Sequence, residues 1–107
     1  MSDDVCEVVI TAPDADWLAD FGRRLIEDRL CASGQIAPIR TLYRWLGEMN
    51  DKTEARVALH TRVGLVPQII ERTLREHPYE VPGLVTLPIQ EGSPAYVAWI
   101  LDGTREP

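Results

Sequence analysis

The sequence predicts an α+β domain, a ferredoxin-like β-α-β-β-α-β sandwich with an extra C-terminal helix. Short β-branched runs alternate with stretches whose apolar residues recur at helical spacing. Two of the extended runs are joined by a polar turn, and the 107 residues suffice for one core but not for two. We therefore interpret residues 1–107 as a single domain.

The first strand and helix follow from residue type and period. Val5 to Thr11 is a short, largely β-branched apolar run, which is typical of a buried strand, and Pro13 and Asp14 end it. From Ala15 the spacing becomes helical, with charged residues mostly on the opposite side. The predicted apolar stripe consists of Ala15, Leu18, Ala19, Gly22, Leu25, Ile26 and Leu30.

A hairpin is predicted next. Residues 34–46 begin irregularly and then alternate, which places Tyr43 and Trp45 on one face of a strand. Residues 47–52, GEMNDK, form a polar turn, and alternation returns from Ala55 to Thr61. The two runs should pair through arms that are long for a small domain.

The second helix is bounded by glycine and proline signals. Gly64 and Pro67 open it, and His77-Pro78 ends it because a residue before proline avoids helical angles. Its predicted stripe consists of Val66, Ile69, Ile70, Thr73 and Leu74.

One strand and one short helix complete the chain. Leu84 to Ile89 reads as a strand in which Pro88 lies near an end or an edge, because proline donates no hydrogen bond to a ladder. Ser93-Pro94 caps a helix over Tyr96 to Leu101, which Asp102-Gly103 ends.

Composition excludes several classes of protein. Seventeen acidic against eleven basic residues give a net charge of −6, and the basic residues are not segregated, so nucleic acid is not expected as a partner. No stretch approaches the roughly 20 apolar residues of a membrane span, and the acidic start, Met1 to Asp4, differs from a secretory signal. Cys6 and Cys31 form no CxxC or Cys/His cluster and read as reduced, mostly structural residues. We expect a cytoplasmic protein without a membrane partner.

Two helices can cover only one face of the predicted four-stranded sheet. The other face carries residues such as Tyr43 and Trp45 or their strand partners. Large exposed apolar patches are rare on monomers, and copies of the same chain can bury such a face. The sequence therefore predicts a closed homo-oligomer.

Four segments carry a family resemblance. They are VVITAPD at 8–14, TLYRWLGEM at 41–49, HPYEVPGLVTLPI at 77–89 and GSPAYVAWI at 92–100. In this order and spacing the chain resembles the CutA family of divalent-cation tolerance proteins. The resemblance implies a protomer similar to the PII signalling proteins, a tight homotrimer laced by its hairpins, and a role in the response to metal ions, copper above all.

The segment around His77 offers candidate metal ligands. His77 supplies an imidazole, Glu80 a carboxylate and Tyr79 a phenol, in one loop stiffened by two prolines. Nitrogen and oxygen ligands favour Cu(II) among divalent ions. His77 and Glu80 alone fall short of a closed site with four protein ligands, so a bound ion would keep water or use a neighbouring subunit.

Departures from the family pattern weaken a thiolate copper site. Some relatives carry cysteines where this chain has Ile10 and, in the best register, Ala32, with Cys31 one residue earlier. His60 stands where a lysine is common and could act as a further ligand only if it faced the same cleft.

Structural interpretations compete with these site hypotheses. His77 and Glu80 also suit a helix stop with local hydrogen bonds, and Tyr43, Trp45 and Tyr79 suit interface packing. In a trimer, the strand with Tyr43 and Trp45 and the loop with Tyr79 would form an inter-subunit cleft, and clefts are the usual ligand sites.

Three function classes remain to be separated. The first is a trimer that binds copper or another divalent cation and requires no cofactor. The second is a PII-like signalling or scaffold trimer that binds a small metabolite in its clefts and an unidentified protein at its hairpin ends. The third, an acylphosphatase-like enzyme, is disfavoured because the loop after the first strand contains Asp14, whose charge repels phosphate. We found no defensible catalytic constellation and expect a non-enzyme.

Overall fold

The computed structural model describes residues 4–104 and contains four strands and three α-helices. Residues 1–3, part of the acidic start considered above, lie outside the described residues. A 3-10 turn, η1, precedes the second helix. The elements are β1 Val5–Ala12, α1 Ala15–Glu27, β2 Ser33–Trp45, β3 Glu48–Arg62, η1 Val63–Leu65, α2 Val66–Glu76, β4 Leu84–Pro88 and α3 Pro94–Gly103.

The four strands form one antiparallel sheet in the order β2-β3-β1-β4. In the middle of the sheet, Val9 of β1 pairs with Ala58 of β3 on one side and with Val85 of β4 on the other. Strand β4 is an edge strand and ends at Pro88, where the missing N–H is tolerated. The α+β class and the order of the elements are as predicted.

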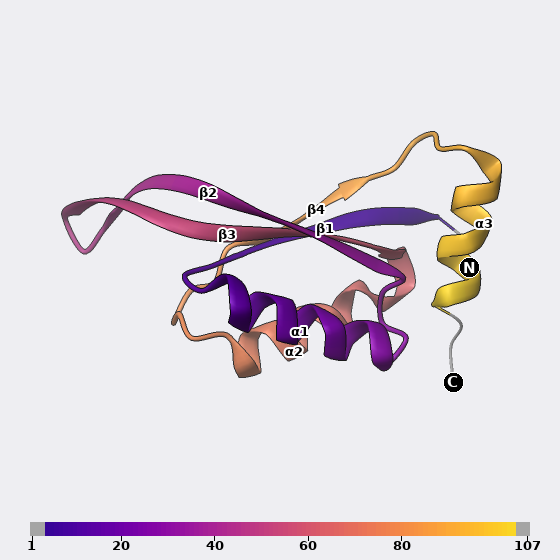
Figure 1. Cartoon of the computed structure of the whole chain (residues 1–107), viewed down its shortest axis with the longest axis horizontal. Coiled ribbons are helices and arrows are strands. Elements are labelled where there is room, and N and C mark those ends of the chain that lie inside the picture. Colours follow the sequence, from indigo (N-terminus) through magenta and orange to yellow (C-terminus); the bar gives the residue numbers. More distant parts are fainter. Residues whose placement is uncertain (1–3, 105–107) are drawn as a thin grey trace.

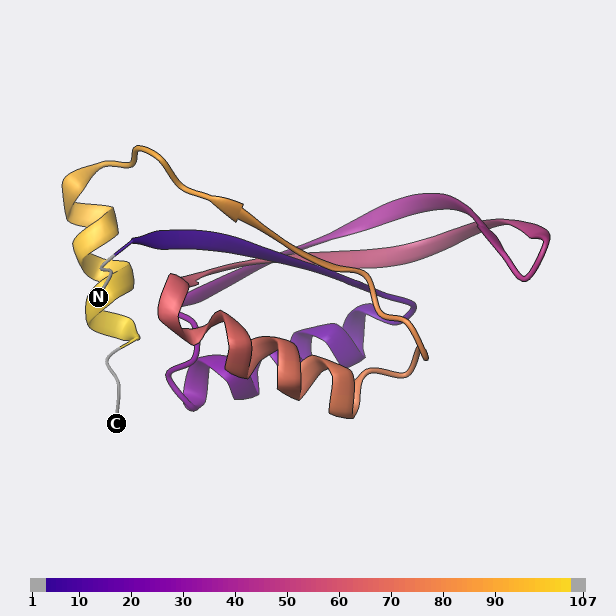
Figure 2. The same cartoon turned by 180° about the vertical axis from the view of Figure 1, so that it is seen from behind.

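Helices α1 and α2 lie on one face of this sheet, and α3 lies at one end of it (Figures 1 and 2). The core between α1, α2 and the sheet includes Ile10, Leu18, Phe21 and Ile69, each fully buried. Phe21 was not in the predicted stripe, while the predicted Ile26 is 38% exposed. The predicted helical spacing of the buried residues was therefore right, but the buried face is rotated toward Phe21 and away from Ile26.

The predicted turn at residues 47–52 is wrong. Strand β3 begins at Glu48, and the turn consists of Leu46 and Gly47, with φ angles of 52° and 83°. Two consecutive residues with positive φ match the twist of a two-residue hairpin. The strands therefore continue through residues that appeared too polar for a sheet.

The far half of the hairpin is a two-stranded arm, residues 39–45 and 48–54. Within the sheet these residues pair only with each other, because β1 pairs with β3 from Ala55 onward. The arm extends beyond the helices on that side (Figure 1). A two-stranded ribbon without a further strand or packed helix is only marginally stable in water. The arm therefore gains little stability from the single chain.

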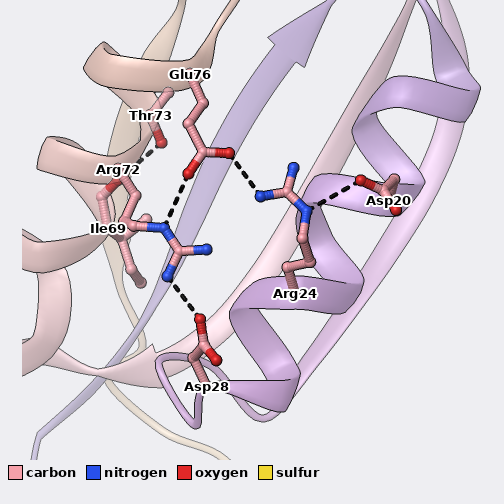
Figure 3. A network of polar contacts seen from close by, with 7 residues as sticks. All are labelled: Asp20, Arg24, Asp28, Ile69, Arg72, Thr73 and Glu76. Carbon is pink, nitrogen blue, oxygen red and sulfur yellow. Dashed lines mark hydrogen bonds and ion pairs between the residues drawn. The ribbon is translucent and has the colours of Figure 1, made fainter.

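Ion pairs join α1 to the last turn of α2 (Figure 3). Arg24 Nη1 of α1 lies 2.6 Å from Glu76 Oε1, and Arg72 Nε lies 3.1 Å from Glu76 Oε2. Arg72 also reaches Asp28, at 2.7 Å. The hydrogen bond from Arg24 is the main reason that the pKa of Glu76 is lowered. These contacts fix the end of α2, where the loop to β4 begins.

Helix α3 closes one end of the sheet. Ser93 accepts a hydrogen bond from the backbone N–H of Tyr96, as the predicted cap requires, and Ile100 is fully buried. Arg62 of β3 donates to the Leu101 carbonyl at 2.6 Å. Across the described part of the chain, none of the helices is long and apolar enough to cross a membrane.

Candidate functional site

A cleft of about 430 Å³ lies between the hairpin arm and the loop from α2 to β4. Thr41 pairs with Lys52 and Tyr43 pairs with Asn50, which places residues from both strands of the arm on one face. The lining residues are Thr11 of β1, Thr41, Tyr43 and Trp45 of β2, Asn50, Lys52 and Glu54 of β3, and Pro78, Tyr79, Glu80, Val81 and Gly83 of the loop.

The loop is held beside β1 through Thr11. The Nε2 atom of His77 donates to the Thr11 carbonyl at 2.8 Å, and the Thr11 N–H donates to the Gly83 carbonyl at 3.1 Å. A Cβ atom at Gly83 would lie 2.7 Å from Thr11 Oγ1, so this close approach requires glycine. Both ends of the loop are therefore fixed to the same residue of the sheet.

His77 ends α2 and orders the loop. It is the C-cap residue in an extended conformation, as the pre-proline rule predicted. It is 8% exposed, and its Nδ1 accepts the Tyr79 N–H at 3.0 Å while its ring packs edge-on against Trp17. Both ring nitrogens are thus engaged, and a metal ion could use either one only by displacing a hydrogen bond.

Tyr79 connects the loop to the hairpin. Its hydroxyl donates to Glu54 Oε2 at 2.6 Å, a length typical of a hydrogen bond to an ionised carboxylate. This hydrogen bond is the largest cause of the raised pKa of Tyr79, followed by burial, and Tyr43 adds a smaller contribution. Glu54 itself is only 5% exposed.

The predicted cleft residues come together within a single chain. Tyr43, Trp45 and Tyr79 all line the cleft, and Glu80 joins them with an exposed side chain, whereas His77 is not one of the lining residues. The contribution of a second subunit stays a prediction. Glu54 of β3 and Thr41 of β2 were missed, and the only signal for them was their position on the same face of the sheet as Tyr43 and Trp45.

The remaining candidate ligands lie elsewhere or are buried. His60 is outside the cleft, where its Nε2 lies 3.0 Å from Glu7 and its Nδ1 contacts the Tyr96 hydroxyl. Cys6 and Cys31 are buried and free, and burial raises the pKa of Cys31 to about 12, which disfavours a thiolate. Among the described residues, no group of three or more His, Cys, Asp and Glu side chains could hold a metal ion.

Comparison with known proteins identifies the family. The sequence model of the family described as CutA1 divalent ion tolerance protein matches residues 6–103. The chain belongs to this CutA family. It is 36% identical over 98 residues to the divalent-cation tolerance protein CutA of Thermus thermophilus, covering 91% of this chain and 95% of that protein. It is 33% identical to the CutA homolog of Danio rerio, covering 92% of this chain and 67% of that protein.

Solved CutA structures share the fold. CutA1 of Thermus thermophilus superposes with a TM-score of 0.89 at 34% identity, over 94% of this chain and 99% of that one. CutA1 of Oryza sativa gives a TM-score of 0.92 at 28% identity, over 99% and 100%. The protein from Archaeoglobus fulgidus, described as a periplasmic divalent cation tolerance protein CutA, gives 0.92 at 26% identity, over 94% and 99%. The mixed fold of this CutA chain is therefore that of the family.

Proposed function

We propose that this CutA family member is a non-catalytic, homotrimeric divalent-cation tolerance protein whose cleft binds a divalent cation, with copper as the first candidate. Family membership supports the cation tolerance role. The observation that carries the cation site is the exposed carboxylate of Glu80 at the cleft, on a loop held at both ends by Thr11. We also propose the ferredoxin-like, PII-like description for the protomer, supported by the strand order.

The hairpin arm supports the trimer. It carries exposed apolar side chains, with Leu42 64% and Met49 65% exposed, and no third strand from residues 4–104 pairs with it. On the sheet face opposite the helices, Val85 and Leu87 of β4 are 60% and 44% exposed. Copies of the chain packed on these surfaces would bury them. Light scattering in dilute buffer should give three chains per particle, and a stable monomer would refute this part of the proposal.

A cation in the cleft would be partly hydrated. Glu80 supplies oxygen ligands, and His77 orders the loop that presents them. Any further protein ligand would come from a neighbouring subunit, because a closed site needs about four protein ligands. A site of this kind would favour copper over other divalent ions through the general affinity order.

Calorimetric titration with Cu(II) tests the cation site. We expect stoichiometric binding that weakens at least about tenfold in Glu80→Gln and in His77→Ala, the first through a ligand and the second through the loop. Glu91→Gln, which changes an exposed carboxylate outside the cleft, is the matched control and should bind as the wild type does. Equal affinity in all four proteins, or no stoichiometric binding, would refute the site.

The second candidate function is that of a PII-like signalling or scaffold trimer that binds a small metabolite. The specific observation in its favour is the presence of three aromatic side chains, Tyr43, Trp45 and Tyr79, in a cleft whose volume suits a small organic molecule. A partner protein would then contact the hairpin end, where Leu46 is 85% exposed.

We also propose a cytoplasmic location. Its support is the pair of free, buried cysteines, Cys6 and Cys31, because secreted domains of this size commonly use cysteines in disulfides. Fractionation of cells that produce the protein tests this assignment.

A further inference from the structure

The carboxylate of Glu54 lies at the cleft without a cationic partner among the described residues. It is 5% exposed, and its hydrogen bond comes from the neutral Tyr79 hydroxyl. Among residues 4–104 it forms no ion pair with a lysine, arginine or histidine, although Lys52 and Arg56 are two positions away on the same strand. Buried charges in proteins are normally paired, so Glu54 creates a place where a positive charge is stabilised.

Aromatic rings line the same space. Tyr43, Trp45 and Tyr79 line the cleft together with Glu54, and the faces of such rings attract cations. Organic ammonium groups are recognised by cages of this composition, because their diffuse charge keeps contact with both rings and carboxylates. Lys52 also lines the cleft, but its side chain is exposed and can extend into solvent.

A buried hydroxyl supplies a third feature. Thr41 Oγ1 is the one buried side-chain oxygen or nitrogen atom in the described part of the chain without a hydrogen-bond partner. Thr41 lines the cleft, on the same strand face as Tyr43. An unsatisfied buried polar atom is unfavourable, so a polar group of a ligand that reached Thr41 Oγ1 would be favoured.

A bare metal ion fits the inner cleft poorly. Divalent cations require several oxygen, nitrogen or sulfur ligands at short range, and among the described residues Glu54 belongs to no group of three or more His, Cys, Asp and Glu side chains that could hold an ion. An organic cation instead needs one carboxylate, aromatic faces and a volume of a few hundred cubic ångströms, and the cleft offers about 430 Å³.

We propose that the inner part of the cleft binds an organic ammonium ion, such as the protonated amine or quaternary ammonium group of a small metabolite. Glu54 would neutralise its charge, Tyr43, Trp45 and Tyr79 would surround it, and Thr41 would hydrogen bond to a polar substituent. This inference rests on the second candidate function and names its class of ligand. It places the ammonium group at Glu54, whereas the proposed divalent cation is held at Glu80.

The test compares charged probes with uncharged molecules of the same shape. Choline is paired with neohexyl alcohol, in which carbon replaces the quaternary nitrogen, and benzylammonium is paired with benzyl alcohol. Calorimetry is performed on the full chain at neutral pH with a chelator present, so that metal binding does not contribute. We expect at least one cation to bind about tenfold or more tightly than its neutral counterpart. The proposal would be overturned if neither cation bound, or if each cation bound no more tightly than its neutral counterpart.

Two variants locate the binding site. Glu54→Gln keeps the volume and the Tyr79 contact but removes the charge, and it should weaken ammonium binding at least about tenfold. Glu91→Gln is again the control and should not change it. If Glu54→Gln does not fold, the comparison of each cation with its neutral counterpart on the wild-type protein still decides the question. Ammonium binding that is unchanged in folded Glu54→Gln would overturn the assignment to this cleft.

The outcome is separable from that of the cation proposal. Glu54→Gln should retain Cu(II) binding, and Glu80→Gln should retain most ammonium binding, because Glu54 is proposed to bind the ammonium ion and Glu80 the divalent cation. Copper binding without ammonium binding would overturn only the present inference. Ammonium binding without copper binding would support it and refute only the copper site.

Discussion

The imidazole Nε2 of His77 lies 2.8 Å from the carbonyl oxygen of Thr11, and this contact joins the end of α2 to the end of β1. The same ring accepts the N–H of Tyr79 through Nδ1, which fixes the neutral tautomer with its proton on Nε2. His77 therefore organises the loop that forms one wall of the cleft.

The hydrogen bonds of His77 should be measurable as stability. His77→Phe keeps an aromatic ring beside Trp17 but leaves the Thr11 carbonyl and the Tyr79 N–H without their partners. We expect the free energy of unfolding in urea to fall by about 1–3 kcal/mol. His77→Ala should fall further, because it also loses the ring packing. Equal stability of the wild type and both variants would contradict the role of His77 as the clamp of the loop.

The hydroxyl of Tyr79 should be essential for stability at this site. Tyr79→Phe leaves the buried Glu54 carboxylate without its donor, and we expect a loss of about 1–3 kcal/mol in the free energy of unfolding. The raised pKa of Tyr79 has a second consequence. Its contribution is fully present below the ordinary pKa of 10.0 and is lost as the pH rises toward the folded-state pKa. Alkaline unfolding curves of the wild type should therefore show a loss of stability that Tyr79→Phe lacks.

The lowered pKa of Glu76 predicts acid sensitivity. Because the folded-state pKa lies below the ordinary value of 4.5, its stabilising contribution is present above that value and is lost as the pH falls through the folded-state pKa. Glu76→Gln should be less stable than the wild type at neutral pH and should lose less stability on acidification. Glu71→Gln, an exposed carboxylate of the same helix, is the control. Parallel pH profiles for wild type and Glu76→Gln would contradict the role of the Arg24 and Arg72 contacts.

The hairpin turn contains a residue that is poorly suited to its conformation. Leu46 has φ of 52°, a region that asparagine and glycine tolerate better than leucine does. Leu46→Asn creates an Asn-Gly turn, and we expect it to raise the free energy of unfolding by about 1 kcal/mol. Met49→Asn removes a similarly exposed apolar side chain without the positive φ, and thermal unfolding should show no such gain. A gain of equal size in both variants would exclude the backbone explanation.

Much of the fold could be predicted from the spacing of apolar residues and from the glycine and proline residues that end helices and strands. The run from Val5 and the switch to helical spacing at Ala15 located β1 and α1, and His77-Pro78 located the end of α2 within a residue. The burial of Phe21 could not be predicted with equal accuracy, because the buried side of a helix depends on the sheet beneath it. The turn was predicted too long because the side chains of residues 48–52 are mostly exposed within one chain, so these residues need not alternate between apolar and polar.

The sequence grouped three aromatic residues of the cleft but did not indicate how the cleft is assembled. The aromatic residues Tyr43, Trp45 and Tyr79 were identified as residues of one cleft, and they line one cleft of a single chain. The role of Glu54 depends on contact with Tyr79, 25 residues later in the chain, and no local pattern encodes such a contact. The same holds for the engagement of both nitrogens of His77, since Thr11 is 66 residues away.

The position of β1 between β3 and β4 also affects how the protein is made. Strand β1 leaves the ribosome first, yet its two neighbours are encoded at residues 55–62 and 84–88. The centre of the sheet therefore cannot be completed until β4 has been synthesised, and its assembly depends on contacts between distant parts of the chain, which form slowly. In the interval the β-branched segment after Val5 has unpaired edges, so folding of the nascent chain competes with its aggregation.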